Sequence, residues 1–352
     1  MVMGGSPVSR SRPAATLLLS LLLVPAAWAA GPEMPAARGT PMLLALDTTT
    51  GHSPSMRAGT EAIATGAMIA VIYPESAEPY RSIFTQIIEG IEDKARNRVT
   101  RLLVGRNSSN QDIANELRRQ DVRVVIALGR NGLRTAMAVN GELKIVAGGL
   151  LSLPEAESRK VTLLSLAPDP GLLFERLKSL MPEVHRVHVV FDPNNSGWLI
   201  RLARDAARAT GLELVAQEAG DLGTALGRYQ SLLATADPKR DALWLPQDST
   251  TVDESTILPL VLQESWSRNL AVFSSNLAHA RRGALFSLYP DTTEMGRNLA
   301  LTAMDSLSGT VVRGQFPLRN LLLAVNMRTA SHLGLKFSER QQQTFHLTFP
   351  EP

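Results

Sequence analysis

The sequence predicts an α/β protein of two Rossmann-like lobes, each built on a mainly parallel sheet and joined to the other by crossing segments. Short apolar runs alternate with amphipathic helical patterns from residue 67 onward, and the alternation resumes after a break at Pro168-Asp169-Pro170. Strands that alternate with helices form parallel sheets covered on both faces. The 352 residues suit two domains of ordinary size, and a content of 44% hydrophobic and 20% charged residues is typical of a globular protein.

Residues 1–29 have the pattern of an export signal peptide. Arg10 and Arg12 precede an apolar run that starts at Ala14, and Ala27-Trp28-Ala29 is a small-x-small cleavage site. We expect cleavage before Ala30, because an apolar run of about eleven residues is too short to span a bilayer comfortably. An uncleaved anchor is the alternative. Residues 30–65, rich in Ala, Pro and Gly, predict a flexible leader.

The mature chain is expected to be almost neutral and lacks cysteine. The full chain has 36 basic and 33 acidic residues, and removal of the signal peptide removes Arg10 and Arg12 and no acid. This balance gives little support to a nucleic-acid partner. The absence of cysteine excludes disulfides, a thiol nucleophile, a Cys-ligated metal and lipid attachment at an N-terminal cysteine. We therefore expect a periplasmic monomer with an ordinary core.

The first lobe is predicted at residues 66–165 with a later contribution from about residues 289–310. Its helices have apolar residues on one face, as at Ile83, Ile87 and Ile91. The expected strands span residues 67–73, 101–104, 122–128, 144–147 and 161–166, and the expected helices span residues 79–96, 111–120 and 133–138.

The second lobe is predicted at residues 166–288 and about 311–337, followed by a tail at 338–352. Its architecture repeats that of the first half without sequence similarity, and the return of short elements near its end suits a chain that crosses between lobes more than once. The expected strands span residues 187–191, 212–216, 242–245, 270–273, 284–288 and 321–325, and the expected helices span residues 171–180, 199–209, 222–234, 252–267 and 328–333. A further helix, expected at residues 293–307, falls in the part of the chain that returns to the first lobe.

Small and polar residues follow the predicted strands. In open parallel α/β sheets, ligands gather beyond the carboxyl ends of the strands. At one such end, the segment from Val187 to Trp198 reads as a strand, a polar loop and a helix N-terminus that favours a negatively charged group. The predicted ligand-binding residues are Glu75, Ser76, Tyr80, Gly129, Arg130, Asn131, Gly148, Asp192, Asn194, Asn195, Ser196, Gln247, Asp248, Ser249, Ser274, Ser275, Asn276 and Tyr289.

Each of these residues also has a structural interpretation. Asn, Asp, Ser and Gly are common in turns and helix caps, so the prediction of a site depends on the recurrence of such loops at corresponding strand ends. Arg130 can pair with a carboxylate ligand in a bidentate manner, and the alternative is a solvent-exposed guanidinium. Tyr80, Trp198 and Tyr289 can stack on a flat ligand, or they can serve packing.

The sequence predicts no enzyme, cofactor or metal site. It has no Gly-x-Gly-x-x-Gly after a strand, no phosphate loop and no Gly-x-Ser-x-Gly elbow. The six His do not cluster, and His185 and His188 fall on opposite faces of a strand. Glu75 and Glu78 are two acids in one loop, which leaves a hydrolase that uses loop carboxylates as a weaker alternative.

Four segments give the chain a family resemblance, which spans about residues 67–337. They cover residues 189–197 (VVFDPNNSG), 241–246 (DALWLP), 282–291 (RGALFSLYPD) with 295–297, and 324–330 (AVNMRTA). In their order and spacing the chain resembles ABC transporter substrate-binding proteins with the type I periplasmic-binding fold, in the branch that includes tryptophan/tyrosine-type binders. No single segment is a catalytic signature.

The resemblance implies that a solute binds in a cleft between two lobes, and that closure of the lobes presents it to permease subunits at the inner membrane. The expected solute is a small polar molecule, with an amino acid or a related carboxylate as candidates. Many members carry a lipid-attachment cysteine, and this chain has none. The acidic loop from Glu75 to Tyr80 also departs from the usual pattern. The alternative function is a periplasmic sensory or partner-binding protein that signals to a membrane receptor.

Overall fold

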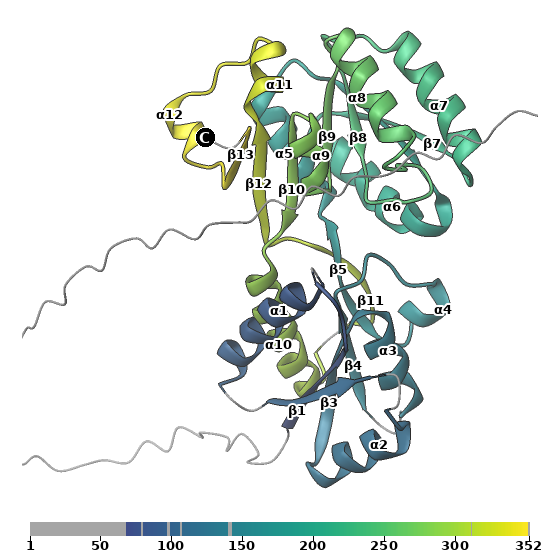
Figure 1. The fold of residues 1–352 in the computed structure, drawn as a ribbon, viewed down its shortest axis with the longest axis vertical. Coiled ribbons are helices and arrows are strands. Elements are labelled where there is room, and N and C mark those ends of the chain that lie inside the picture. Colours follow the sequence, from purple (N-terminus) through teal and green to yellow (C-terminus); the bar gives the residue numbers. More distant parts are fainter. Residues whose placement is uncertain are drawn as a thin grey trace, which may run out of the picture. The chain divides into compact units, whose positions relative to one another are not determined.

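A computed structural model describes residues 68–350, apart from positions 79, 97–98, 106–107, 140–142 and 311. The predicted signal peptide, its cleavage site and the predicted leader lie outside the described residues. Two sheets with flanking helices make up the described part of the chain (Figure 1). The predicted α/β class with two lobes is confirmed.

The first sheet is parallel throughout and has the strand order β11-β5-β4-β3-β1-β2. On β1, Ile69 and Val71 contribute to one hydrophobic cluster, whereas Ala70 and Ile72 contribute to another on the opposite face. Burial on both faces explains why β1 is continuously apolar. The strands are β1 (Met68–Pro74), β2 (Val99–Val104), β3 (Val122–Leu128), β4 (Lys144–Gly148), β5 (Thr162–Pro168) and β11 (Gly314–Leu318).

Two helices from distant parts of the chain cover one face of this sheet. They are α1 (Tyr80–Ala95) and α10 (Thr292–Ser308), whose apolar residues share one cluster with β1 and β3. Their backbones approach closely at two glycines, because a Cβ on Gly90 would lie 2.0 Å from Thr293 O and a Cβ on Gly296 would lie 2.0 Å from Ile87 O. The other helices of this lobe are α2 (Asn110–Arg119), α3 (Gly129–Ala138) and α4 (Glu155–Ser158).

The second sheet has the strand order β13-β12-β10-β9-β8-β6-β7. Its pairs are parallel except for β10 with β12, which is antiparallel. The strands are β6 (Arg186–Phe191), β7 (Glu213–Glu218), β8 (Asp241–Leu245), β9 (Ala271–Ser274), β10 (Phe286–Pro290), β12 (Leu321–Asn326) and β13 (Leu347–Phe349).

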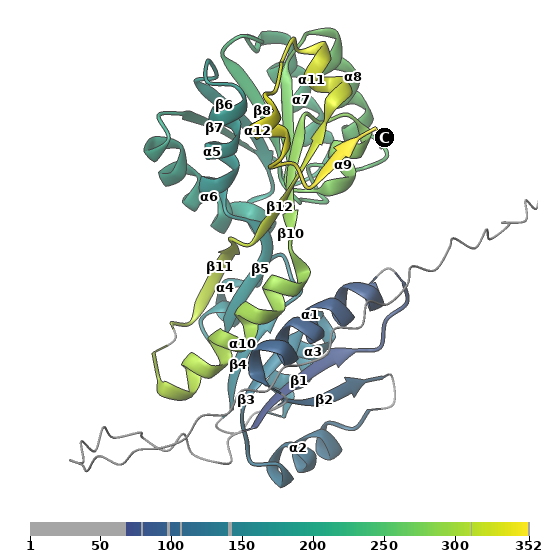
Figure 2. The ribbon, with the colours of Figure 1, turned by 90° about the vertical axis from the view of Figure 1, so that its left-hand side faces the viewer.

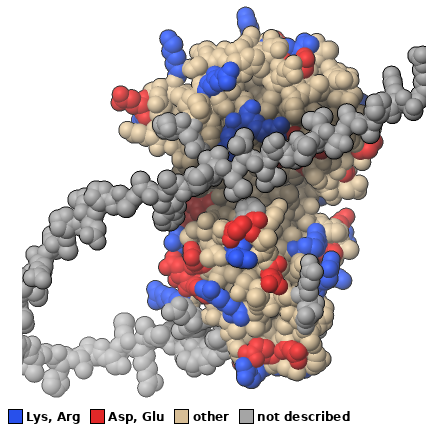
Figure 3. Space-filling model, in the orientation of Figure 1, with Lys and Arg blue, Asp and Glu red and all other residues tan. Residues whose placement is uncertain are grey.

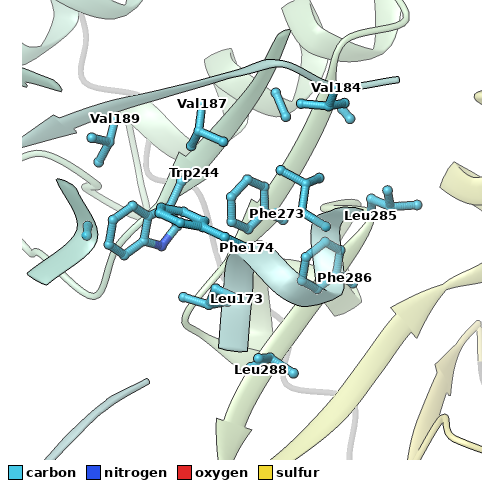
Figure 4. Packing of buried hydrophobic residues seen from close by; sticks show 14 of the residues in the cluster. Leu173, Phe174, Val184, Val187, Val189, Trp244, Phe273, Leu285, Phe286 and Leu288 are labelled. Carbon is cyan, nitrogen blue, oxygen red and sulfur yellow. The ribbon is translucent and has the colours of Figure 1, made fainter. Parts of the chain in front are cut away.

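Four aromatic side chains pack together in the core on one face of the second sheet. Phe174 packs edge-on against Trp244 and Phe273, with ring centroids 5.7 and 6.4 Å apart, and Phe273 stacks on Phe286 at 5.2 Å (Figure 4). The helices of this lobe are α5 (Pro170–Leu180), α6 (Pro193–Ala209), α7 (Leu222–Thr235), α8 (Ile257–Ser267), α9 (Leu277–Arg282), α11 (Met327–His332) and α12 (Glu339–Gln342).

Three segments connect the sheets: β5 to α5, β10 to α10, and β11 to β12 (Figure 2). The third is hydrogen-bonded to both of the others, because Asp169 N donates to Leu318 O at 2.8 Å and Asp291 N donates to Asn320 O at 3.1 Å. Arg319 Nη1 also donates to Asp169 Oδ2 at 2.6 Å. The crossing segments therefore form one hydrogen-bonded bundle.

The structure differs from the sequence-based expectation in four places. Residues 314–318 were assigned to the second lobe, but β11 pairs with β5 in the first sheet. The expected tail at 338–352 contains α12 and β13, and β13 pairs with β12. The expected loops at Gly129–Gly132 and at Asn194–Trp198 are first turns of α3 and α6. Pairing with β5 and with β12, rather than local periodicity, defines β11 and β13.

Charged groups of both signs are present on the face shown in Figure 3, in keeping with the nearly equal numbers of acidic and basic residues. Among the described helices, none has the length and apolar character required to cross a bilayer.

Candidate functional site

A pocket of about 300 Å³ receives side chains from both lobes. The first lobe contributes two residues that follow β4, and the second lobe contributes residues that follow β6, β8 and β9. The volume is at the lower end of the range for small-molecule sites. The lining residues are Leu151, Ser152, Asn195, Pro246, Gln247, Asp248, Ser249, Val252, Glu254, Asn276 and His279.

A larger hollow of about 790 Å³ lies beside α2 and the first residues of β3 and β4, where Leu117, Val122 and Lys144 line it. These positions are at the amino ends of parallel strands. Ligands of open α/β sheets bind beyond the carboxyl ends, so the smaller pocket is the better candidate.

Asp248 is the centre of a buried polar network on the second-lobe side of the pocket. Its Oδ2 accepts hydrogen bonds from Asp192 N at 2.8 Å and Ser196 Oγ at 2.9 Å. Its Oδ1 accepts from Thr250 N at 3.1 Å and Asn195 Nδ2 at 3.3 Å. The carboxylate therefore ties the start of α6 to the loop after β8, and protein donors occupy both oxygens.

Asp192 is the N-cap of α6. Its Oδ1 accepts from Asn194 N at 2.9 Å, and Pro193 at the first helical position needs no acceptor. Asn195 Nδ2 lies 3.3 Å from Asp192 Oδ2 and 3.3 Å from Asp248 Oδ1, so this amide bridges the two carboxylates. Asp192 and Ser196 are buried, whereas Asn195 is exposed and lines the pocket.

His279, in the first turn of α9, lines the pocket with a defined tautomer. Asn276 caps α9, and its Oδ1 accepts from Ala278 N at 3.0 Å. This cap turns the Asn276 amide nitrogen toward His279 Nε2, 3.4 Å away, so Nε2 accepts and the proton lies on Nδ1. Nδ1 then donates to Ser274 Oγ at 2.7 Å, and the Ser274 hydroxyl donates to Leu245 O at 3.0 Å.

The His279 ring is 2% exposed. Burial, reinforced by the nearby Arg282 guanidinium, lowers the pKa of His279 to about 4. The ring is therefore neutral at pH 7, and the lone pair of Nε2 is directed at the Asn276 amide.

Gln247 and Glu254 also belong to the pocket lining. Gln247 Oε1 is buried and has no hydrogen-bond partner among the described residues. Glu254 places Oε2 3.4 Å from Arg282 Nη1, while its Oε1 lies 3.8 Å from His279 Nε2. Buried acceptors without donors are uncommon in folded proteins, and a ligand is one source of the missing donor.

Arg130 does not line the pocket. Its Nη1 donates to Glu157 Oε2 at 3.0 Å and its Nη2 donates to Ser152 O at 3.3 Å. The guanidinium that the sequence predicted as a partner for a ligand carboxylate is thus occupied within the first lobe. It holds the backbone of Ser152, whose residue does line the pocket.

The other predicted residues of the first lobe lie outside the pocket lining. Glu75 and Asn131 are exposed, Ser76 Oγ donates to Pro74 O at 3.4 Å, and Tyr80 is 64% exposed. Gly129 and Gly148 serve packing: their added Cβ atoms would lie 3.1 Å from the Phe84 ring and 2.7 Å from Leu299 Cδ1.

The pocket brings together Asn195, Gln247, Asp248, Ser249 and Asn276 of the predicted second-lobe residues. The remaining predicted residues of this lobe do not line it. Asp192, Asn194 and Ser196 belong to the α6 cap and the Asp248 network. Ser274 bonds to His279, and Ser275 Oγ accepts from Trp244 Nε1 at 3.0 Å. Tyr289 packs against the small apolar cluster of Ala280, Ala324 and Phe349.

Sequence reasoning missed Glu254 and His279 as pocket residues. The sequence was read for clusters of histidine, and His279 stands alone. The signal that could have found His279 is its spacing from Asn276, because three residues place both side chains at the first turn of one short helix. The first-lobe contact from Leu151 and Ser152 has no such local signal. Among the described residues, no group of three or more His, Asp or Glu side chains could hold a metal ion.

Comparison with solved structures shows the fold. A substrate-binding protein with adhesive properties from Clostridium difficile, in its ligand-free open form, is 16% identical, with 80% of this chain and 98% of that chain covered and a TM-score of 0.55. A conserved domain protein from Vibrio cholerae is 18% identical, with 80% and 99% covered and a TM-score of 0.49. An ABC domain from Streptococcus pneumoniae in complex with L-Trp is 16% identical, with 81% and 100% covered and a TM-score of 0.49.

No curated protein sequence matches this chain. The family model described as ABC transporter substrate binding protein matches residues 68–343, which is most of the chain and all but the last strand of the described fold. This match confirms the resemblance that the four sequence segments indicate, and the family consists of binding proteins rather than enzymes. The chain belongs to the ABC transporter substrate-binding protein family.

Proposed function

We propose that this protein captures a small polar solute in the pocket between its lobes and delivers it to ABC permease subunits at the inner membrane. The observation that carries the proposal is the composition of the pocket lining. Ser152 of the first lobe faces the same pocket as Gln247 and Glu254 of the second lobe. A ligand in contact with both walls has a higher affinity for the arrangement in which both walls reach it.

The crossing segments supply the hinge of this mechanism. Closure requires dihedral changes in a few residues at the ends of elements, and here those residues are Pro168 to Pro170, Pro290 to Thr292 and Leu318 to Leu321. Hydrogen bonds from Asp169 N and Asp291 N to the third segment keep the three strands of the hinge together. The solute stabilises the closed arrangement by its differential affinity, and the permease recognises that arrangement. No covalent bond is made or broken.

The proposed location is the periplasm, after export through a cleaved N-terminal signal peptide. The support is the sequence of residues 1–29, with two Arg residues, an apolar run and Ala27-Trp28-Ala29. The N-terminal residue of the protein isolated from its host tests this point. Ala30 as the first residue supports export and cleavage, whereas an intact N-terminus contradicts cleavage.

Native mass spectrometry of the purified mature protein tests solute capture directly, because a closed cleft retains its ligand. A metabolite library is then screened for compounds that raise the melting temperature and make the small-angle scattering profile more compact. Binding of a ligand at one hundred times its Kd stabilises a protein by about 2.7 kcal/mol. If no metabolite changes either measurement, capture of a solute with high affinity is wrong.

Two serine variants localise the binding. Ser249 is exposed and lines the pocket, so Ser249→Trp fills the pocket without removing a hydrogen bond of the Asp248 network. We expect this variant to fold and to lose the ligand-dependent rise in melting temperature. Ser267→Trp at the end of α8 is the matched control, since Ser267 is exposed in the same lobe and outside the pocket. Equal responses of the two variants would place the solute elsewhere.

A further inference from the structure

A hollow of about 360 Å³ lies beside the segments that connect the lobes. It shares no lining residue with the pocket between the lobes. One wall is a face of α5, and the remainder comes from β10, from the third crossing segment and from the first residue of β12. The apolar part of its lining consists of Leu172, Leu288 and Leu321, which belong to or pack against the main core cluster of the second lobe. The second lobe and a crossing segment therefore bound the hollow together.

Arg176 of α5 is a half-buried cation without an acidic partner in this hollow. Its guanidinium forms no ion pair and no hydrogen bond with any other described residue. Burial lowers the pKa of Arg176, and no neighbouring acid counters that effect. Arg186 shows the opposite direction, because its hydrogen bonds to Asp241 raise its pKa. Removing a charge from water without pairing it costs free energy, so a ligand anion that pairs with Arg176 would recover part of that cost.

Two further hydrogen-bond donors line the hollow. Arg319 of the third crossing segment is held by Asp169, whose Oδ2 accepts from Arg319 Nη1 at 2.6 Å, and its other nitrogens have no partner within the described part of the chain. Ser179 follows Arg176 by three residues on the same face of α5, and its exposed hydroxyl forms no hydrogen bond with a described residue. The one acid in the lining is Glu175, which is exposed and pairs with no described cation. The hollow thus combines donors from two chain segments with a single unpaired positive charge.

We propose that this hollow is a second ligand site, which binds a small monocarboxylate with a short apolar chain. A carboxylate has the two coplanar oxygens that the donor fork of Arg176 matches. Its single charge balances the one unpaired cation, whereas the acids at positions 169 and 175 disfavour a phosphate dianion. The apolar chain covers the leucines of the lining. A carboxylate that also reaches Arg319 connects α5 with the third crossing segment, so the site lies where a ligand can act on the hinge. The inference does not depend on capture of a solute between the lobes.

Four probe molecules test the class of ligand in titrations of the mature full-length protein followed by ligand-observed NMR. The reference probe is 3-methylbutanoate. Its amide, 3-methylbutanamide, has the same shape without the charge, acetate lacks the apolar chain, and inorganic phosphate has more charge and no chain. We expect 3-methylbutanoate to bind more tightly than the other three, and at least roughly tenfold more tightly than the amide, because the amide loses charge-assisted hydrogen bonds. Its affinity should fall as sodium chloride is added.

Four variants test the place of binding. Arg176→Gln removes the unpaired charge, and we expect it to weaken binding of 3-methylbutanoate by roughly tenfold. Arg319→Gln changes an exposed side chain of the same lining and should weaken binding to a smaller extent. Arg201→Gln is the matched control, because Arg201 is an exposed arginine on α6 of the same lobe and lies outside the hollow. Ser249→Trp, which fills the pocket between the lobes, should leave binding of 3-methylbutanoate unchanged. The melting temperature of each variant without ligand shows that it is folded.

The outcomes separate this site from the pocket between the lobes. Binding of 3-methylbutanoate that is weakened in Arg176→Gln and retained in Arg201→Gln and Ser249→Trp supports the proposal. Absence of binding, equal or tighter binding of the amide, acetate or phosphate, or unchanged binding in both Arg176→Gln and Arg319→Gln would overturn it. Loss of binding in Ser249→Trp would also overturn it, because the carboxylate would then lie between the lobes. Solute capture is judged separately, by the metabolite library and the ligand-dependent rise in melting temperature.

Discussion

Acidification should destabilise this protein through His279, and the variant His279→Asn should remove that dependence. The ring is 2% exposed and neutral at pH 7, and its pKa in the folded protein is lowered to about 4 from the ordinary 6.5. Between these values the unfolded chain takes up a proton that the folded chain rejects, so stability is complete above pH 6.5 and falls as the pH approaches 4. A difference of about 2.5 pH units, at about 1.4 kcal/mol each, corresponds to about 3 kcal/mol.

The assay is urea unfolding of the mature protein at several pH values between 7 and 4, with the free energy of unfolding obtained by linear extrapolation. The Asn amide can still donate to Ser274 Oγ, as His279 Nδ1 does, but it does not titrate. We expect the variant to be less stable than the original at pH 7, owing to the smaller side chain. The difference between the two should then shrink by about 3 kcal/mol toward pH 4.

His185→Asn is the control, because it also removes one histidine but from an exposed position. We expect this control to follow the pH dependence of the original protein. If the stabilities of the original protein and His279→Asn remain parallel over the whole pH range, the assignment of a neutral buried imidazole at the pocket is refuted.

Three further predictions concern stability. Gly296→Ala should lower the free energy of unfolding by several kcal/mol, roughly the cost of overpacking, because the new Cβ would meet Ile87 O at 2.0 Å. Asp248→Ala should cost about 3 kcal/mol or more, since it leaves two buried donors without acceptors. Asp241→Asn should destabilise the protein mainly above pH 4. Burial tends to raise the pKa of Asp241, but hydrogen bonds from Arg186 and other groups outweigh burial and lower this pKa. The stabilisation that the carboxylate provides is therefore present at neutral pH and lost on acidification. Thermal and urea unfolding measure all three.

Each of these variants has a matched control. Gly227→Ala on α7 places its Cβ in open space and should stabilise the helix by up to about 1 kcal/mol. Asp221→Ala removes an exposed N-cap and should cost about 1 kcal/mol, less than Asp248→Ala. Asp205→Asn acts on an exposed pair with Arg208 and should have almost no effect. Losses in the controls as large as those in the buried variants would contradict the assigned contacts.

The candidate site was predictable only in part. Asn195, Gln247, Asp248 and Asn276 follow strands of the second lobe, and the rule that ligands gather at strand carboxyl ends is sufficient to select them. That rule cannot decide which of the polar side chains at the strand ends are hydrogen-bonded to other parts of the protein and which remain for a ligand. Asp192 and Asp248 belong to the same kind of loop, but only contacts between loops far apart in sequence show that Asp192 caps α6 and that Asp248 receives four protein donors.

The sequence by itself determined the class of fold, because runs buried on both faces of a parallel sheet are continuously apolar. Val122–Leu128, apolar apart from the exposed Arg123, is one such strand and was predicted with the bounds that the structure has. Gly129 to Gly132 have the composition of a loop, yet they begin α3. The glycine at position 132 is required by packing, because a Cβ there would lie 2.6 Å from Ile72 O. The strand at residues 314–318 includes Pro317 and was not recognisable, because an edge strand tolerates proline and its partner lies about 150 residues earlier.

Tertiary structure alone decided which side chains meet. Periodicity reports how a segment buries its own apolar face, and it contains no information on which loops become neighbours when two lobes are joined by three crossing segments. The contact of Ser152 with the pocket of Gln247 and His279 depends on that joining. The sequence therefore determined two α/β lobes and the strand ends at which a ligand should be sought, and the packing of those lobes decided which of these residues line one pocket.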